Sequence, residues 1–109
     1  MEIIKERDGS SLTVKLVGRL DAATAMQLDK DFATSLKGVG ALTIDLAQLN
    51  YVASAGLRIL LKTQKKMDRQ GSMVIKNVQD AVREVLDMTG FSKFLTIEDA
   101  APKKLQISF

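Results

Sequence analysis

The chain has 109 residues, 46% of them hydrophobic, and its 16 basic and 13 acidic residues give a net charge of +3. This length suits one compact domain, and the absence of cysteine and histidine excludes disulfides, thiolate nucleophiles and the usual neutral-pH proton shuttle. Because the apolar runs are short, the charges interspersed and tyrosine used only once, we predict a cytoplasmic protein that binds neither membranes nor nucleic acid.

The N-terminal third of the sequence predicts a β-hairpin and then a helix. Residues 2–7 and 11–17 flank the turn signal Asp8-Gly9-Ser10, and the second segment alternates apolar with polar residues. Asp21 is the candidate N-cap of the helix, which Gly38 and Gly40 stop. The apolar residues of this helix recur at helical spacing: Ala25, Leu28, Phe32 and Leu36.

The middle of the chain predicts a strand and a second helix. Residues 41–46 read as a buried strand, and the order strand, helix, strand implies a right-handed crossover with parallel pairing. Because the hairpin is antiparallel, the sheet is expected to be mixed. The second helix runs from Ser54 to about Gln70 and ends at Gly71. Its apolar side consists of Leu57, Leu60, Leu61 and Met67.

The other side of this second helix carries a basic stripe. Its members recur at steps of three and four residues and so share one exposed side: Arg58, Lys62, Lys65 and Arg69, with Lys66 nearby. The stripe is either an ordinary solvated face or a landing surface for an acidic partner. Ile59 lies well off the core side, and we interpret it as an exposed anchor for such a partner.

The C-terminal third predicts one more strand, a third helix and a short final strand. Residues 72–76 read as the strand, Asn77 as the helix cap and Gly90 as the helix end. The core face of the third helix consists of Val78, Val82, Val85 and Leu86. Residues 91–97 supply apolar mass for the final strand, and residues 98–101 could begin a last helical turn.

We divide the chain into a domain, residues 1–99, and a C-terminal tail, residues 100–109. Within the tail, residues 103–109 alternate like a strand but lie beyond the last obvious core segment. A docked edge strand, a strand that pairs with a partner and a frayed end all fit this pattern.

The most informative segment joins the central strand to the second helix. In residues 51–57 an apolar strand pattern ends in small residues and passes, at Ser54, into the helix. A serine at this position can cap the free N–H groups of the first helical turn. The positive end of the helix dipole would also favour a phosphate on the same hydroxyl. The residues alone fit two roles for Ser54, a plain helix cap and a phosphorylation switch.

Four short motifs, taken together, carry a resemblance to a known family. In chain order they are Gly18-Arg19-Leu20-Asp21 with Thr24; Asp45-Leu46; Ser54-Ala55-Gly56-Leu57; and Leu86-Asp87-Met88-Thr89-Gly90-Phe91. At these separations the chain resembles the STAS domain, specifically the small bacterial anti-sigma factor antagonists, to about Asp99. The resemblance implies one α/β domain with a mixed, mainly parallel sheet of four to five strands and three to four helices packed largely on one face.

The resemblance also implies a mechanism, partner switching. The unphosphorylated antagonist binds an anti-sigma factor, a serine kinase of the GHKL type, and so frees a sigma factor; phosphorylation of the antagonist reverses this. By position, Ser54 matches the family's phosphoacceptor. We therefore expect a binding protein rather than an enzyme, without catalytic residues, metal or cofactor, with such a kinase and a PP2C-type phosphatase as its partners.

A partner-binding rim is expected around Ser54. Asp21 caps the first helix, helps to dock the kinase, or does both, whereas Thr24 and Asn50 are interpreted as structural first. The complete set of predicted partner-binding residues is Asp21, Thr24, Asn50, Tyr51, Ala53, Ala55, Gly56, Arg58, Ile59 and Lys62.

The loop departs from the family's commonest form on both sides of Ser54. Ala53 replaces the usual acidic residue and Ala55 a frequent second hydroxyl, which leaves Ser54 as the only acceptor in the loop. Either a kinase recognises the loop without the acidic residue, or the protein binds its partner constitutively, as a STAS signalling or scaffold module in a pathway without a sigma factor. A third class, a nucleotide-binding domain, lacks a Gly-rich phosphate loop here.

Overall fold

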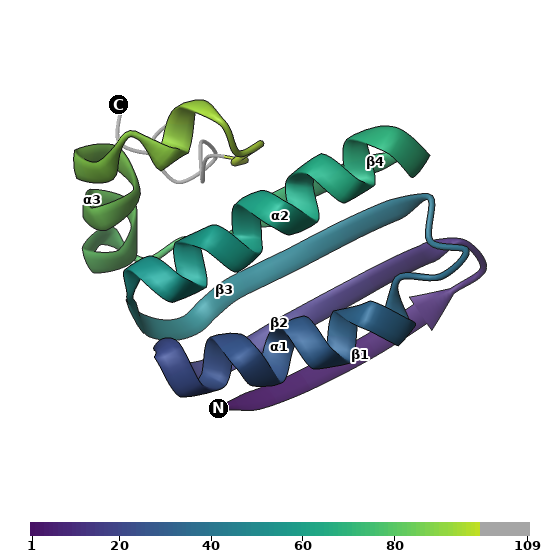
Figure 1. Ribbon diagram of the computed structural model, residues 1–109, viewed down its shortest axis with the longest axis horizontal. Helices are drawn as coiled ribbons and strands as arrows, with labels where there is room; N and C mark the ends of the chain where they lie inside the picture. The colour runs from purple at the N-terminus through teal and green to yellow at the C-terminus, as the bar shows by residue number, and fades with distance from the viewer. Residues whose placement is uncertain (99–109) are drawn as a thin grey trace, which may run out of the picture.

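Hydrogen bonds join four strands into one sheet in the order β1-β2-β3-β4 (Figure 1). In this computed structural model, which describes residues 1–98, the strands are β1 (Glu2–Asp8), β2 (Ser11–Leu20), β3 (Ala41–Val52) and β4 (Ser72–Lys76). β1 and β2 form the predicted antiparallel hairpin, whereas β2 with β3 and β3 with β4 pair in parallel. The prediction of a mixed, mainly parallel sheet is confirmed.

Two helices cover one face of this sheet. α1 (Ala22–Ser35) connects β2 to β3, α2 (Ser54–Gln70) connects β3 to β4, and the two helices lie side by side in Figure 1. Both crossovers join parallel strands, and their shared right-handedness places both helices on the same face. α3 (Asp80–Thr89) packs against β3 and is followed by a short 3₁₀ helix, η1 (Phe91–Lys93).

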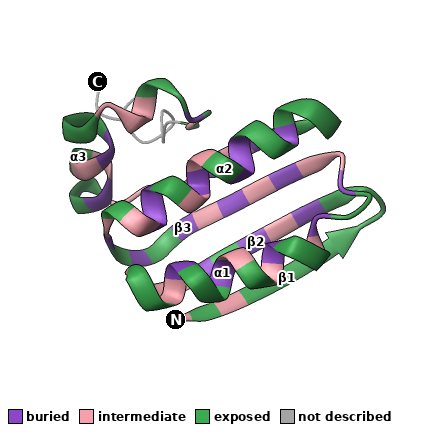
Figure 2. Cartoon of the chain, in the orientation of Figure 1, coloured by how far each residue is buried: buried purple, intermediate pink, exposed green. Residues whose placement is uncertain are grey.

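The hydrophobic core lies between the sheet and the two covering helices. Every second residue of β2 from Leu12 to Leu16 is buried, and β1 remains largely exposed along its length (Figure 2). Two polar side chains of α2, Thr63 and Gln64, are also buried, with 4% of each exposed. Gln64 accepts a hydrogen bond from the backbone N–H of Thr96 at 3.0 Å, and so joins the C-terminal segment to α2.

β3 is longer than the sequence predicted. The apolar alternation indicated an end at Leu46, whereas the strand continues to Val52. Two register shifts against β2 add residues to β3, so its later buried positions no longer alternate but fall at Leu46, Leu49 and Val52. Each bulge interrupts the alternation of buried and exposed residues along the strand. The apolar pattern of the sequence therefore no longer indicates a strand there.

The C-terminal predictions need three corrections. The N-cap of α3 is Gln79 rather than Asn77, which instead turns the chain with a φ of 58°. In place of a final strand, residues 91–93 form η1, and only Ile97 forms an isolated parallel bridge, to Ile75. Phe94, predicted to supply apolar mass, is 66% exposed. The predicted last helical turn and the tail continue beyond Glu98, outside the described residues.

Gly56, in the first turn of α2, lies directly on the end of β2. A Cβ atom added there would lie 2.6 Å from Leu20 Cγ and 2.9 Å from the Leu20 carbonyl oxygen. Both distances are shorter than any real Cβ contact, and the backbone oxygen belongs to a hydrogen-bonded strand. Glycine is therefore required at this position for the helix to reach the sheet.

We expect Gly56→Ala to lower the free energy of unfolding by at least about 1 kcal/mol, because overpacking outweighs the helix propensity that alanine gains. Urea denaturation of both proteins measures the difference. Gly40→Ala is the matched control, since a Cβ there meets only Ser10, at an ordinary 3.6 Å from Oγ and 3.8 Å from Cβ. An equal loss in the two variants would contradict the steric explanation.

Candidate functional site

The sequence segments predicted to form the site meet at one end of the sheet. The backbone N–H of Ala53 donates a 2.9 Å hydrogen bond to the carbonyl of Leu20, which closes the parallel pairing of β2 and β3. Asp21 directly follows Leu20 in the chain and Ser54 directly follows Ala53, so the starts of α1 and α2 lie next to each other (Figure 1). The structure thus brings together residues that are far apart in the chain.

Asp21 is the N-cap of α1, as predicted, and forms a capping box with Thr24. The backbone N–H of Thr24 donates to Asp21 Oδ1 at 3.0 Å, and the Asp21 N–H donates to Thr24 Oγ1 at 2.8 Å. The Thr24 hydroxyl also donates to the Arg19 carbonyl at 2.7 Å. The N–H bond from Thr24 is the main reason that the pKa of Asp21 lies below its ordinary value, so the carboxylate is charged at neutral pH.

Ser54 is not the N-cap of α2, which corrects one of the two interpretations of this residue. The cap is Ala53, with an extended φ of −100° and ψ of 170°, and no side chain caps the helix. Ser54 is the first helical residue and its side chain is exposed. The first helical hydrogen bond runs from the Leu57 N–H to the Ala53 carbonyl at 3.1 Å, so the preceding first-turn N–H groups have no helical acceptor.

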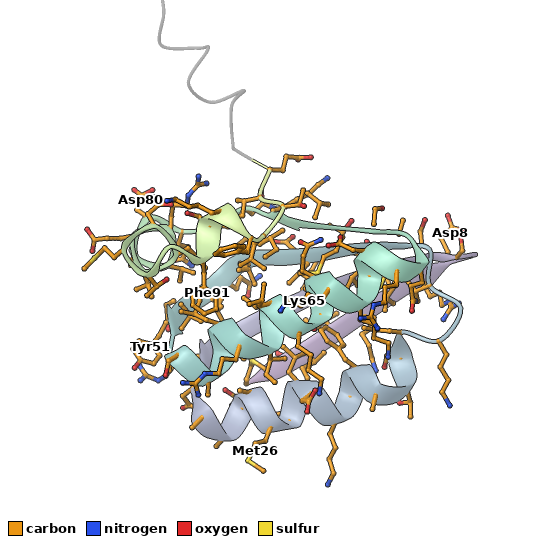
Figure 3. All side chains as sticks on the ribbon, turned by 45° about the horizontal axis from the view of Figure 1, so that its top comes forward. Asp8, Met26, Tyr51, Lys65, Asp80 and Phe91 are labelled. Carbon is orange, nitrogen blue, oxygen red and sulfur yellow. The ribbon has the colours of Figure 1, made fainter. Side chains whose placement is uncertain are left out.

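The sequence did not indicate a pairing between Arg19 and Tyr51. The two residues are cross-strand partners on β2 and β3, and the Arg19 guanidinium lies 4.1 Å from the centre of the Tyr51 ring. Tyr51 is 41% exposed and lies at the end of the molecule where α2 begins (Figure 3). The bulges of β3 determine which residues of β2 and β3 lie opposite each other. The spacing of residues in the sequence therefore did not indicate this contact.

The remaining predicted residues differ in how far a partner could reach them. Asn50, Arg58 and Lys62 are exposed, whereas Ala53 and Ala55 are half-buried. Gly56 is buried, so its contribution is to position the helix. Ile59 was expected to be an exposed anchor but is half-buried and packs against the core.

Leu61 also departs from its predicted place on the core side of α2. It is only half-buried and lies instead in a shallow hollow lined by the basic stripe: Arg58, Lys62, Lys65, Lys66 and Arg69. The described part of the chain, residues 1–98, contains no group of three acidic or other ligating side chains that could hold a metal ion. Within the same residues, no helix is long and apolar enough to span a membrane.

Comparisons with known proteins agree on one family. Residues 3–97 match the family model described as Mlab, STAS domain. The chain is 30% identical over 102 residues to BtrV of Bordetella bronchiseptica, which carries the name of an anti-sigma factor antagonist, and the match covers 92% of this chain and 88% of BtrV.

The fold is similar to that of solved anti-sigma factor antagonists. The unphosphorylated form of the antagonist SpoIIAA matches with a TM-score of 0.76 at 16% identity, covering 97% of this chain and 96% of SpoIIAA. The phosphorylated form of SpoIIAA from Bacillus matches with a TM-score of 0.69 at 15% identity, covering 97% of this chain and 99% of SpoIIAA. At these identities the likeness shows the fold alone.

The capping box makes the start of α1 sensitive to acid. Because the pKa of Asp21 is lower in the folded chain, its charged form stabilises the fold above the unfolded-state pKa of about 3.9, and this contribution is lost as the pH falls through the folded-state pKa. We expect Asp21→Ala to lower the melting temperature at pH 7, and the difference from the parent to shrink below pH 4. Thermal unfolding at pH 7 and pH 3 measures both.

Asp21→Asn is the matched control, since asparagine caps helices about as well as aspartate without the charge. Its melting temperature at pH 7 should lie between those of the parent and Asp21→Ala. A loss for Asp21→Ala that stays constant down to pH 3 would show that the carboxylate does not act as the charged cap.

Proposed function

The chain belongs to the STAS domain family, and we propose that it is an anti-sigma factor antagonist whose binding to its partner is switched by phosphorylation of Ser54. The observation that carries the proposal is an exposed hydroxyl on the first residue of a helix whose N-terminus no side chain caps. The similarity to BtrV supports the assignment of the family's function.

In the unphosphorylated state, this end of the domain offers a surface of small, neutral and charged side chains around the Ser54 hydroxyl. Asn50 and Tyr51 are exposed on one side of Ser54, and Asp21 lies at the adjacent helix start. The small side chains of Ala53 and Ala55 leave the Ser54 hydroxyl accessible to a second protein. We infer that an anti-sigma factor that is a GHKL-type serine kinase binds here, and that Asp21 contributes the charged edge of the contact.

A phosphate on Ser54 would add about −1.5 to −2 charges at neutral pH. Two features let the domain hold this charge: the first-turn N–H groups of α2, which have no helical acceptor, and Arg58 one helical turn further along the same side. The phosphate would change the charge of the bound interface and occupy the space that a partner needs. The switch would therefore act at the interface, and a PP2C-type phosphatase would reset it.

The chain itself would be the substrate of a kinase rather than an enzyme, and its described residues contain no group of acidic side chains that could hold a catalytic metal. An antagonist of an anti-sigma factor acts where transcription occurs, so the proposal places the chain in the cytoplasm.

One alternative follows from a specific residue. Ala53 gives α2 an N-cap without a carboxylate, so a kinase that needs an acidic neighbour would phosphorylate Ser54 poorly. The chain would then bind its partner constitutively, as a STAS signalling or scaffold module in a pathway without a sigma factor.

Phosphate mapping tests the switch. After incubation with ATP and a GHKL-type kinase encoded beside this gene, we expect mass spectrometry to find one phosphate, on Ser54, and none on Ser54→Ala. We expect Ser54→Asp to weaken kinase binding about tenfold, equivalent to about 1.4 kcal/mol, measured by calorimetry. Ser72→Asp, at the start of β4, is the charge-matched control and should bind as the parent does.

Two further variants separate the proposal from its alternative. If the missing carboxylate limits the kinase, Ala53→Asp should be phosphorylated faster than the parent, while Ala53→Ser, which supplies a neutral cap, should not. Kinase binding without any phosphate on Ser54 would favour the constitutive module. Phosphate on another residue, or full kinase binding by Ser54→Asp, would contradict the switch.

A further inference from the structure

A groove runs between α1 and α2 on the side of the helices that faces away from the sheet. Its volume is about 850 Å³, and its apolar floor consists of Ala33, which is exposed, and of the edges of Phe32 and Leu36, which are otherwise buried in the core. Met26 stands at its rim with 75% of its surface exposed, and Figure 3 shows it pointing outward from α1. An apolar side chain this exposed beside an apolar floor is a suitable contact for another protein.

Positive charge surrounds this groove. Lys30 of α1 and Lys62 and Lys66 of α2 line it, and the last two also border the hollow around Leu61 on the other side. Lys62 forms a 3.0 Å ion pair with Asp29, the one carboxylate that lines the groove. Among residues 1–98, Lys30 and Lys66 have no ion pair, nor have the other stripe residues: Arg58, Lys65 and Arg69.

We propose that the groove between α1 and α2 is a second docking site, which takes an acidic amphipathic helix of a partner protein. The apolar stripe of such a helix would contact Met26 and the groove floor, and its acidic residues would face Lys30 and Lys66. Charge complementarity selects this occupant. A second copy of this chain would instead set like charges against each other on the same face.

The charged end of the docking site is separate from the switch, whereas Ala23 and Met26 at its other end lie in the first turns of α1. Lys66 lies about 18 Å beyond Ser54 along α2, at 1.5 Å of rise per residue. This distance is about twice the Debye length at physiological ionic strength, so a charge on Ser54 would be largely screened there. The second site therefore does not rest on the proposed phosphorylation, and it should bind its helix in either state of Ser54.

A designed peptide tests the proposal on the full chain. The probe is a synthetic helix of about 15 residues with leucines at i, i+3, i+4 and i+7 and glutamates on its other side. In a titration followed by ¹H–¹⁵N NMR, we expect shift changes confined to residues that line the groove. The double variant Lys30→Glu with Lys66→Glu should weaken binding at least tenfold, and Met26→Gln at least threefold.

Each variant has a matched control outside the groove. Lys15→Glu with Lys93→Glu changes the charge equally, at exposed positions on β2 and η1, and should alter the affinity less than twofold. Met88→Gln removes an equally exposed methionine, 79% exposed, from α3 and should behave likewise. Ser54→Asp should also change the affinity less than twofold, because the two sites are independent.

Four results would overturn the proposal. A scrambled peptide of the same composition that binds as tightly would show that charge alone is recognised. Shift changes outside the groove, or an equal loss in the control variants, would place the contact elsewhere. Displacement of the peptide by phosphatidylglycerol vesicles would show that the face recognises an anionic membrane rather than a helix.

Discussion

The arrangement of the site depends on one close contact, the first turn of α2 against the last residue of β2. The Ala53 N–H bonds to the Leu20 carbonyl at 2.9 Å, and Gly56 lies so close to Leu20 that no side chain fits between them. Leu20 also precedes Asp21, the cap of α1. A single strand end therefore fixes where both helices begin, and it sets Asp21 and Ser54 next to each other without any direct bond between them.

The residue proposed as the switch is distinct from the residues that stabilise the fold at this end of the domain. Asp21 is satisfied by Thr24, and Leu20 and Gly56 are buried, so the structural interactions at this end are complete without the Ser54 side chain. Ser54 is left exposed on a helix start that has spare N–H groups. A charge added there meets favourable partial charges and displaces no core contact, which is why the proposed switch changes a surface rather than the fold.

Local patterns in the sequence predicted most of the elements but not the details set by long-range packing. The hairpin, the Asp21 cap and the apolar face of α1 are encoded within a few residues of each other and were predicted correctly. The end of β3 and the Arg19–Tyr51 contact depend on bulges in pairing with β2, which no local pattern reports. Ser54 was predicted to be the cap of α2 because serine is a preferred cap, whereas Ala53, whose N–H bonds to Leu20, is the cap and Ser54 is the first helical residue.

For Ser54 to act as a surface switch, the fold must hold a phosphate there without loss of stability. This requirement is tested most directly on protein made with genetically encoded phosphoserine at position 54, by comparing its free energy of urea unfolding with that of the unmodified chain. If the helix N-terminus holds the phosphate, the phosphorylated chain should be more stable by about 0.3–1 kcal/mol at low ionic strength, and this gain should be lost at high salt. A destabilisation of more than about 1 kcal/mol would contradict the surface switch, because the phosphate would then act by disturbing the domain itself.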